Sequence, residues 1–364
     1  MTTYLIRRLI QSFALLVLVS ALIYAILNLV PGGPFDMLKT SNPRVTQSQI
    51  DRLNALLDLD KPLFPGKYCP KVKGEQQPCQ LDPGRYLRWL GRVAQGDFGK
   101  SWTVQAGVPV SEIIGYRLGY TLLLMLLANG IAILLAIPIG LYSAVRQYSA
   151  TDYVVTSLAF FGQSMPTFWT GLLVLSFFAV ALHWFPTGGV KSTGMPGDIL
   201  EALTRMATFG AAYPRLAGRE WEAVLDGLWH LALPVGVLVY FYMAGWIRYT
   251  RSAVLEVMRQ DYIRTARAKG LGERMTILRH GLRNALIPLV TLMALAIPSL
   301  FTGAIITETI FSWPGMGRQL IDAISGVDWP VVQGILVISA GLVIFSNLLS
   351  DVLYALVDPR IKVG

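Results

Sequence analysis

The sequence predicts an all-α integral membrane protein with six transmembrane helices. Only 15% of its 364 residues are charged and 54% are hydrophobic, whereas soluble domains carry about 25% charged residues. Six apolar stretches are nearly free of charge, and each reaches the roughly 20 residues that cross a hydrocarbon core. These stretches are Leu9–Val30, Leu118–Val145, Tyr153–Leu182, Gly227–Ile247, Asn284–Thr307 and Val331–Ser350. Six such stretches cannot all be interior to one soluble core.

The first stretch is expected to remain as an anchor, because its apolar run exceeds the roughly 7–15 residues of a signal-peptide core. Lys and Arg in the short connections indicate which side is cytoplasmic. The segment 248–283 alone carries nine basic residues against three acidic ones. Six alternating spans then place both termini in the cytoplasm. The predicted parts are 1–30 (N-terminus and first helix), 31–116 (external loop), 117–358 (membrane core, with the cytoplasmic loop 248–283) and 359–364 (tail).

The two cysteines, Cys69 and Cys79, lie close together in the predicted external loop. In an oxidising compartment such a pair is typical of a disulfide that closes a loop. Neither cysteine has a histidine neighbour, so the pair is a weak zinc signal, and we expect no metal site.

One motif imitates a nucleotide site. Residues 94–101 read Ala-Gln-Gly-Asp-Phe-Gly-Lys-Ser, a loose match to the phosphate-binding P-loop. That loop requires a preceding strand and a following helix, and this segment lies in the predicted external loop. The three histidines, His183, His230 and His280, stand near three different span ends and suggest no catalytic group. We therefore expect no enzymatic activity and no cofactor in this chain, and no compact basic domain exists to bind nucleic acid.

The cytoplasmic loop holds the most informative segment. Residues 261–272 read Asp-Tyr-Ile-Arg-Thr-Ala-Arg-Ala-Lys-Gly-Leu-Gly, which predicts a short basic helix ended by glycine. A second short helix with apolar side chains should follow. Such a unit suits docking into a groove on a cytoplasmic partner. The alternative is a basic segment that fixes topology and binds anionic membrane lipid, and composition does not separate the two.

This segment resembles the coupling loop of binding-protein-dependent ABC permeases of the dipeptide/oligopeptide branch. Tyr262–Leu271 fits Y-x-R-T-A-R-A-K-G-L, and Arg279–Pro288 fits R-H-x-L-R-N-A-x-x-P. Two further segments agree with that branch: Tyr86–Ser101, with W-L and then G-D-x-G-x-S, and Glu308–Gly334, with E-T-x-F-S-W-P-G and then V-V-Q-G. The long external loop is most similar to B-type subunits of the microcin C/oligopeptide importer of Gram-negative bacteria. Arg264 and Arg283 depart from the wider superfamily, which has Glu and Pro there.

The resemblance implies the type I ABC importer permease fold, in a bacterial inner membrane, with a long periplasmic loop between helices 1 and 2. It implies import of peptides, or peptide-like antibiotics such as microcin C, by alternating access. The implied partners are a second, homologous permease subunit, cytoplasmic subunits that bind ATP and Mg, and a periplasmic peptide-binding protein. The ATPase-coupling residues would be Arg264, Thr265, Ala266, Arg267, Ala268, Lys269, Gly270, Leu271 and Gly272.

Polar residues within or beside the spans are candidates for the translocation path. They are Asn129, Gln163, Ser164, Thr167, Ser299, Thr302 and Glu308. Each would equally serve as a hydrogen bond between helices, and Glu308 would either meet a peptide amino group or begin the next loop. Three other functions stay open: a permease for another solute such as nickel or a dipeptide, a stand-alone channel or secondary carrier, and a membrane-embedded enzyme.

Overall fold

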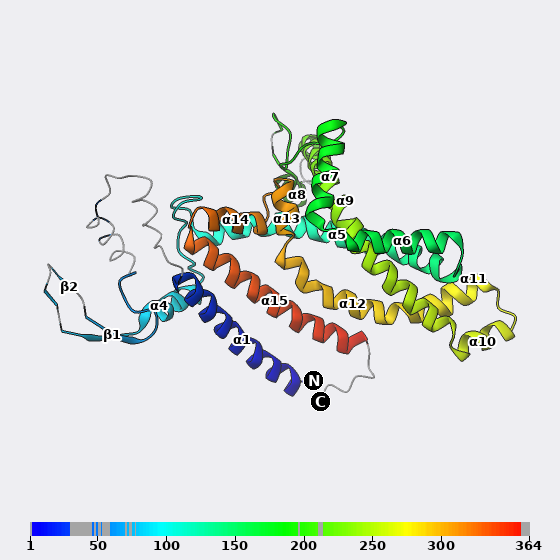
Figure 1. Cartoon of the computed structure of the whole chain (residues 1–364), viewed down its shortest axis with the longest axis horizontal. Coiled ribbons are helices and arrows are strands. Elements are labelled where there is room, and N and C mark those ends of the chain that lie inside the picture. The colour runs from blue at the N-terminus through cyan, green and yellow to red at the C-terminus, as the bar shows by residue number, and fades with distance from the viewer. Residues whose placement is uncertain are drawn as a thin grey trace. The chain divides into compact units, whose positions relative to one another are not determined.

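The computed structural model describes residues 2–29, 59–69, 71–72, 75–76, 78–195, 197–209 and 214–357, with three single positions at 46, 49 and 52 (Figure 1). Within these, the side chains of 2–5, 71–72, 75–76, 209, 214–219, 302 and 354–357 are not described. The chain divides into two compact units. Unit 1 holds Arg117–Arg318 and Phe345–Gly364, and unit 2 holds Thr2–Tyr116 and Gln319–Ile344.

Helices dominate the described residues. In chain order they are α1 (Thr2–Leu29), α4 (Gly84–Val93), α5 (Val110–Val145), α6 (Ala150–Ser164), α7 (Thr167–Val174), the π-helix η1 (Leu175–Ala181), α8 (Ile199–Phe209), α9 (Pro214–Met258), α10 (Asp261–Ala268), α11 (Glu273–Met275), the π-helix η2 (Thr276–Leu282), α12 (Arg283–Thr302), α13 (Ile305–Ile310), α14 (Met316–Ser325) and α15 (Trp329–Val357). The strands are β1 (Gly66–Tyr68), β2 (Lys71–Val72), β3 (Glu75–Gln76) and β4 (Gln80–Asp82).

Five helices of the described chain are long and apolar enough to cross a membrane, and one bent pair passes the same test. The five are Ile6–Leu29, Val110–Val145, Glu220–Met258, Glu273–Phe301 and Trp329–Leu353. The pair is Ala150–Ser164 with Thr167–Ala181. By length and composition the protein is therefore a multi-pass membrane protein of five or six spans, in agreement with the fold class that the sequence predicts.

The third predicted span is not one straight helix. The axes of α6 and α7–η1 differ by 102° at the break between them. Pro166 has no backbone N–H and disfavours the helical conformation of the residue before it. Met165 is accordingly extended, with φ −81° and ψ 130°. The predicted stretch Tyr153–Leu182 is therefore a broken helix and not a straight one, and the Met-Pro step is the physical reason.

Two other predicted boundaries shift. The fifth helix, α12, ends at Thr302 instead of continuing to Thr307, because Gly303 adopts φ 72°, outside the helical region. The fourth predicted helix also changes: α9 continues beyond Ile247 and remains helical as far as Met258. The non-helical connection is therefore much shorter than 248–283.

Unit 1 is built on a stripe of small side chains on α5. Ala128, Ala132 and Ala136 recur every four residues on one helix face, and each is fully buried. The stripe packs against residues of α9 and α12, including Trp246 and Leu289. Small residues allow helix backbones to approach closely where lipid offers no hydrophobic drive for association.

Unit 2 is anchored by aromatic packing between α1 and α4. Tyr24 of α1 packs on Trp89 of α4, with ring centroids 5.1 Å apart, and also on Tyr86. The Tyr86 hydroxyl lies 3.0 Å from Ser20 Oγ and 3.1 Å from the carbonyl oxygen of Val17. The hydroxyl of the buried Tyr86 thus has hydrogen-bond partners on α1, as buried tyrosine hydroxyls usually do.

A hairpin in the predicted external loop carries the two cysteines. Strands β1 and β4 pair antiparallel, with Tyr68 opposite Gln80. Cys69 follows Tyr68 and Cys79 precedes Gln80, so the register brings the two cysteines together, and a disulfide joins them.

We predict that this disulfide is present in the protein isolated from its native membrane. It closes a loop with a sequence separation of 10, for which chain entropy gives a stabilisation of about 2–3 kcal/mol. Mass spectrometry of non-reduced peptides should detect the crosslinked pair, and a reduced sample provides the control. Alkylation of both thiols in the folded, unreduced protein would contradict the prediction.

Candidate functional site

The segment that follows α9 begins with an amphipathic helix. Helix α10 buries Ile263 and Ala266, which lie three residues apart and therefore share a face. The other face exposes Arg264, Thr265 and Arg267. Most of the predicted coupling residues thus lie on a basic, solvent-facing surface, whereas Ala266 is buried with Ile263 and packs the helix against the rest of unit 1.

Gly270 ends this helix in a Schellman motif. The N–H of Gly270 donates to the carbonyl of Arg267 at 2.9 Å, and the N–H of Leu271 donates to that of Ala266 at 3.3 Å. Gly270 itself has φ 77°, the left-handed region that glycine adopts at little cost. Nothing lies within 4 Å of the position that a Cβ would take. The glycine is therefore needed for its backbone conformation and not for space.

An ion pair bridges the turn. The guanidinium of Arg267 in α10 donates to both carboxylate oxygens of Glu273 in α11, at 3.1 Å from Nε and 2.6 Å from Nη2. The carboxylate beside it raises the pKa of Arg267. The bidentate geometry fixes the angle between the two helices on either side of Gly270, although both side chains are largely exposed.

Four apolar side chains are exposed on the same segment. Tyr262 is 42% exposed, Leu271 40%, Met275 50% and Leu278 45%. Apolar side chains that gather next to basic ones on a surface indicate a binding face. The segment therefore presents both an apolar surface and the positive charges of Arg264 and Arg274.

The predicted path residues are found in several different environments. Asn129 is buried and donates to the carbonyl of Met125, one turn earlier. Gln163, Ser164 and Thr167 flank the bend between α6 and α7, where the first two are exposed. The hydroxyl of Ser299 donates to the carbonyl of Ala296, and the side chain of Thr302 lies outside the described residues. Among the described candidates, Gln163 and Ser164 at the bend are the exposed pair.

Glu308 is enclosed rather than open to a path. Its carboxylate is fully buried and accepts hydrogen bonds from Thr121 Oγ1 at 2.9 Å and from the N–H of Arg318 at 3.0 Å. Gly315 and Gly317 leave the space that it fills, since a Cβ on either would lie within 3.0 Å of it. Of the two alternatives that the sequence left open, contact with a peptide amino group would require this carboxylate to become exposed. In this conformation Glu308 ties α13 to α5 and to the start of α14.

A second buried carboxylate explains the motif that imitates a P-loop. Asp328 Oδ2 accepts hydrogen bonds from Ser101 Oγ at 2.5 Å and from the backbone N–H groups of residues 102, 103 and 104. Burial raises the pKa of Asp328, but these hydrogen bonds outweigh it and hold the pKa below the ordinary value. The helix α4, not a strand, precedes the motif. Ser101 therefore anchors the loop to the start of α15.

We predict that Asp328→Asn lowers the thermal stability of the complex. The substitution removes the charge that four donors share, at a cost of about 1–3 kcal/mol. Thermal unfolding of the purified protein measures the effect. Asp60→Asn is the matched control in the same unit, because Asp60 is exposed and accepts from the hydroxyl of Tyr68. Equal midpoints for the two variants would contradict the anchoring role.

Sequence reasoning also missed a buried ion pair near the start of α6. Arg251 of α9 donates to both oxygens of Asp152, at 2.8 and 2.9 Å. Asp152 also accepts from the hydroxyl of Ser143 and the N–H of Tyr148. No sequence pattern connects Asp152 with a residue 99 positions away, so only the fold reveals this link between α6 and α9.

Histidine contacts are local. The Nδ1 atom of His230 lies 2.9 Å from the carbonyl oxygen of Asp226, one helical turn earlier. In the described part of the chain, no three His, Cys, Asp or Glu side chains gather in a way that would hold a metal ion.

Comparison with known proteins agrees with the motifs of the sequence. The model of the family "binding-protein-dependent transport system inner membrane component" matches residues 136–363. The oligopeptide transport system permease protein AppB of Bacillus subtilis (strain 168) is 40% identical over 362 residues, which cover 100% of both chains. The oligopeptide transport system permease protein OppB of Mycobacterium tuberculosis (strain ATCC 25618 / H37Rv) is 37% identical over 365 residues, again 100% of both.

A third relative is named for the transport of dipeptides. The dipeptide transport system permease protein DppB of Escherichia coli (strain K12) is 37% identical over 364 residues, covering 100% of this chain and 99% of the relative. The family model covers more than half of the chain, and these relatives match it over their whole length. The chain therefore belongs to the family of binding-protein-dependent transport system inner membrane components.

Proposed function

We propose that this chain is the membrane-spanning permease subunit of an ATP-driven importer of peptides in a bacterial inner membrane. The observation that carries the proposal is the full-length match to permease proteins named for oligopeptide and dipeptide transport. The five or six candidate spans supply the membrane-embedded part of such a transporter. Separate cytoplasmic subunits would bind ATP and Mg. A periplasmic binding protein would deliver the peptide.

The segment from α10 to η2 is proposed to be the contact with an ATP-binding subunit. Its basic face at Arg264 and Arg267 and its exposed Leu271 and Met275 suit a groove on that subunit. The Schellman turn and the Arg267–Glu273 pair make the segment stiff enough to transmit force. Movement of this segment would then switch the paired permease subunits between outward-open and inward-open states.

The proposed topology places both termini and this segment in the cytoplasm. The excess of basic residues in 248–283 supports that side. The hairpin closed by Cys69 and Cys79 then lies in the periplasm, where disulfides persist. A homologous second permease subunit would complete the path, because the candidate path residues described in this chain are found in several different environments.

Reconstitution tests the proposed function against the stand-alone carrier. The chain with its co-purifying subunits is placed in liposomes loaded with ATP and Mg, and uptake of a radiolabelled oligopeptide is measured. Uptake should require ATP and the binding protein. Liposomes containing this chain alone are the control and should show only background uptake. Rapid peptide flux through the chain alone, without ATP, would overturn the proposal in favour of a channel or secondary carrier.

A further inference from the structure

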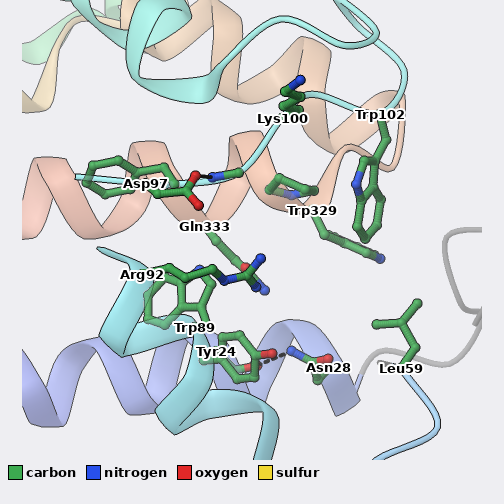
Figure 2. A pocket seen from close by; sticks show the side chains of 13 residues that line it. Tyr24, Asn28, Leu59, Trp89, Arg92, Asp97, Lys100, Trp102, Trp329 and Gln333 are labelled. Carbon is green, nitrogen blue, oxygen red and sulfur yellow. Dashed lines mark hydrogen bonds between the residues drawn. The ribbon is translucent and has the colours of Figure 1, made fainter. Parts of the chain in front are cut away.

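A cavity of about 290 Å³ lies within unit 2 and has no role in the function proposed above. Its walls come from the end of α1, Leu59, α4, residues 97–102 and the start of α15 (Figure 2). Five aromatic side chains line it: Tyr24, Trp89, Phe98, Trp102 and Trp329. The volume is close to the lower end of the range for small-ligand sites.

The position of the cavity along the helices indicates its depth in the membrane. Tyr24 and Asn28 belong to the last two turns of the candidate span that ends at Leu29. Trp329 and Gln333 belong to the first turn or two of the candidate span that begins at Trp329. Both spans therefore end at the cavity. Tryptophan and tyrosine concentrate at the level of the lipid headgroups, so the cavity lies at headgroup depth.

Opposite charges line the cavity without neutralising each other. Arg92, Lys100 and Asp97 contribute to the wall and all three are exposed, and Figure 2 shows the Lys100 ammonium directed away from Arg92. The ion pairs found within the described residues include none for Arg92. Asp97 accepts one hydrogen bond, at Oδ1 from the N–H of Gly99. A cationic and an anionic group thus remain available in one small space.

The neutral amide of Gln333 adds hydrogen-bond donors beside Arg92 in the cavity. Gln333 is only 8% exposed, and its side chain makes no hydrogen bond with the described residues. Figure 2 shows the polar ends of Arg92 from α4 and Gln333 from α15 extending toward the same region. A polar group that is removed from water needs a partner. Together the two side chains present N–H donors to an anionic oxygen.

An apolar ridge leads away from this site along α1. Leu29 directly follows the cavity residue Asn28, and Leu29, Leu22 and Leu18 lie on one face of the helix, seven and four residues apart. They are 74%, 53% and 58% exposed. These leucines offer an apolar surface, beginning next to Asn28, to the chain of an amphiphile whose head occupies the cavity. A water-soluble zwitterion such as a peptide has no acyl chain to place on this apolar surface.

We propose that this cavity binds the headgroup of a zwitterionic, amine-bearing phospholipid of the outer leaflet. The phosphate oxygens accept hydrogen bonds from Arg92 and Gln333, and the ammonium group contacts the carboxylate of Asp97. The acyl chains follow the ridge on α1. The choice of leaflet rests on the topology proposed above, but the inference does not rest on peptide transport, and a solute of any other class would leave it unchanged.

Native mass spectrometry of the purified complex tests the site. Complexes in detergent are exchanged with phosphatidylethanolamine, and the retained lipid is counted after gentle activation. Arg92→Gln should lower retention at least about tenfold, since a charged hydrogen-bond donor is lost. Arg92 is exposed, so the variant should fold. Lys67→Gln, which removes an exposed charge from β1 in the same unit, should retain the lipid like the unaltered protein.

A second variant tests recognition of the amine. Phosphatidylglycerol carries the same phosphate without an ammonium group. The unaltered complex should prefer phosphatidylethanolamine, and Asp97→Asn should remove that preference while lipid is still retained. Equal retention by Arg92→Gln and the unaltered complex would overturn the proposal. Displacement of the lipid by a peptide with a free C-terminus, but not by its C-terminal amide, would also overturn it and assign the cavity to peptide.

Discussion

Replacing Gly270 with valine should reduce peptide uptake at least about tenfold while the chain remains in the membrane at normal abundance. Gly270 has φ 77°, which costs a β-branched residue more than about 1–2 kcal/mol. The new side chain meets no neighbour, so the strain is relieved by changing the turn and redirecting α11 and η2. Uptake by cells that lack the native gene, measured beside the membrane abundance of the variant, gives the result.

Gly272 provides the matched control, two residues away. It has φ −59° and ψ 145°, which valine adopts readily, and its Cβ position is also open. Gly272→Val should therefore lose much less uptake than Gly270→Val. Both variants keep every basic charge of the segment. If Gly270→Val transported peptide normally, the segment would serve only as a basic anchor to anionic lipid, and the coupling role would be rejected.

Replacing Gly315 with alanine should lower the amount of folded protein several-fold. A Cβ at this position would lie 2.3–2.5 Å from the carboxylate atoms of Glu308. Glu308 cannot turn away, because it is fully buried and its hydrogen bonds from Thr121 and Arg318 hold it in place. Overpacking and the loss of these bonds should together cost about 3 kcal/mol or more.

Quantitative blotting of membranes and thermal unfolding of the purified complex measure this effect. Gly130→Ala is the matched control, since Gly130 lies within α5 and nothing approaches its Cβ position. An alanine in that helical position should leave abundance unchanged. If Gly315→Ala and Gly130→Ala gave the same abundance and unfolding midpoint, Glu308 would not be the packed centre that the structure describes.

Local features of this protein could be predicted from the sequence. The length of the apolar stretches identified the spans, because a hydrocarbon core disfavours charged residues along the whole length of a span. The glycine at position 270, placed after a basic helix, identified the turn that the structure shows as a Schellman motif. The bend at Met165–Pro166 is also a local feature, because a proline disfavours the helical conformation of the residue before it. The hydrophobicity of the surrounding stretch is continuous and does not reveal the bend.

The buried polar contacts could not be predicted in this way. Ser101 and Asp328 are 227 residues apart, and Thr121 and Glu308 are 187 apart. Their pairing depends on how the helices pack and leaves no periodicity in the sequence. For the same reason the sequence left two alternatives for Glu308, which stands at the end of an apolar stretch: contact with a peptide amino group, or the beginning of the next loop. Only the close approach of two glycines shows that it is enclosed.

Photo-crosslinking from position 271 tests most directly whether the α10–η2 segment contacts an ATP-binding subunit. Leu271 is 40% exposed beside the Gly270 turn, and a photoreactive amino acid there should be tolerated in living cells. Irradiation should yield a covalent adduct with the ATP-binding subunit. The same amino acid at Leu81, which is 86% exposed beside the disulfide hairpin, should yield no such adduct. Absence of the adduct at position 271 in an abundant, assembled chain would contradict the account.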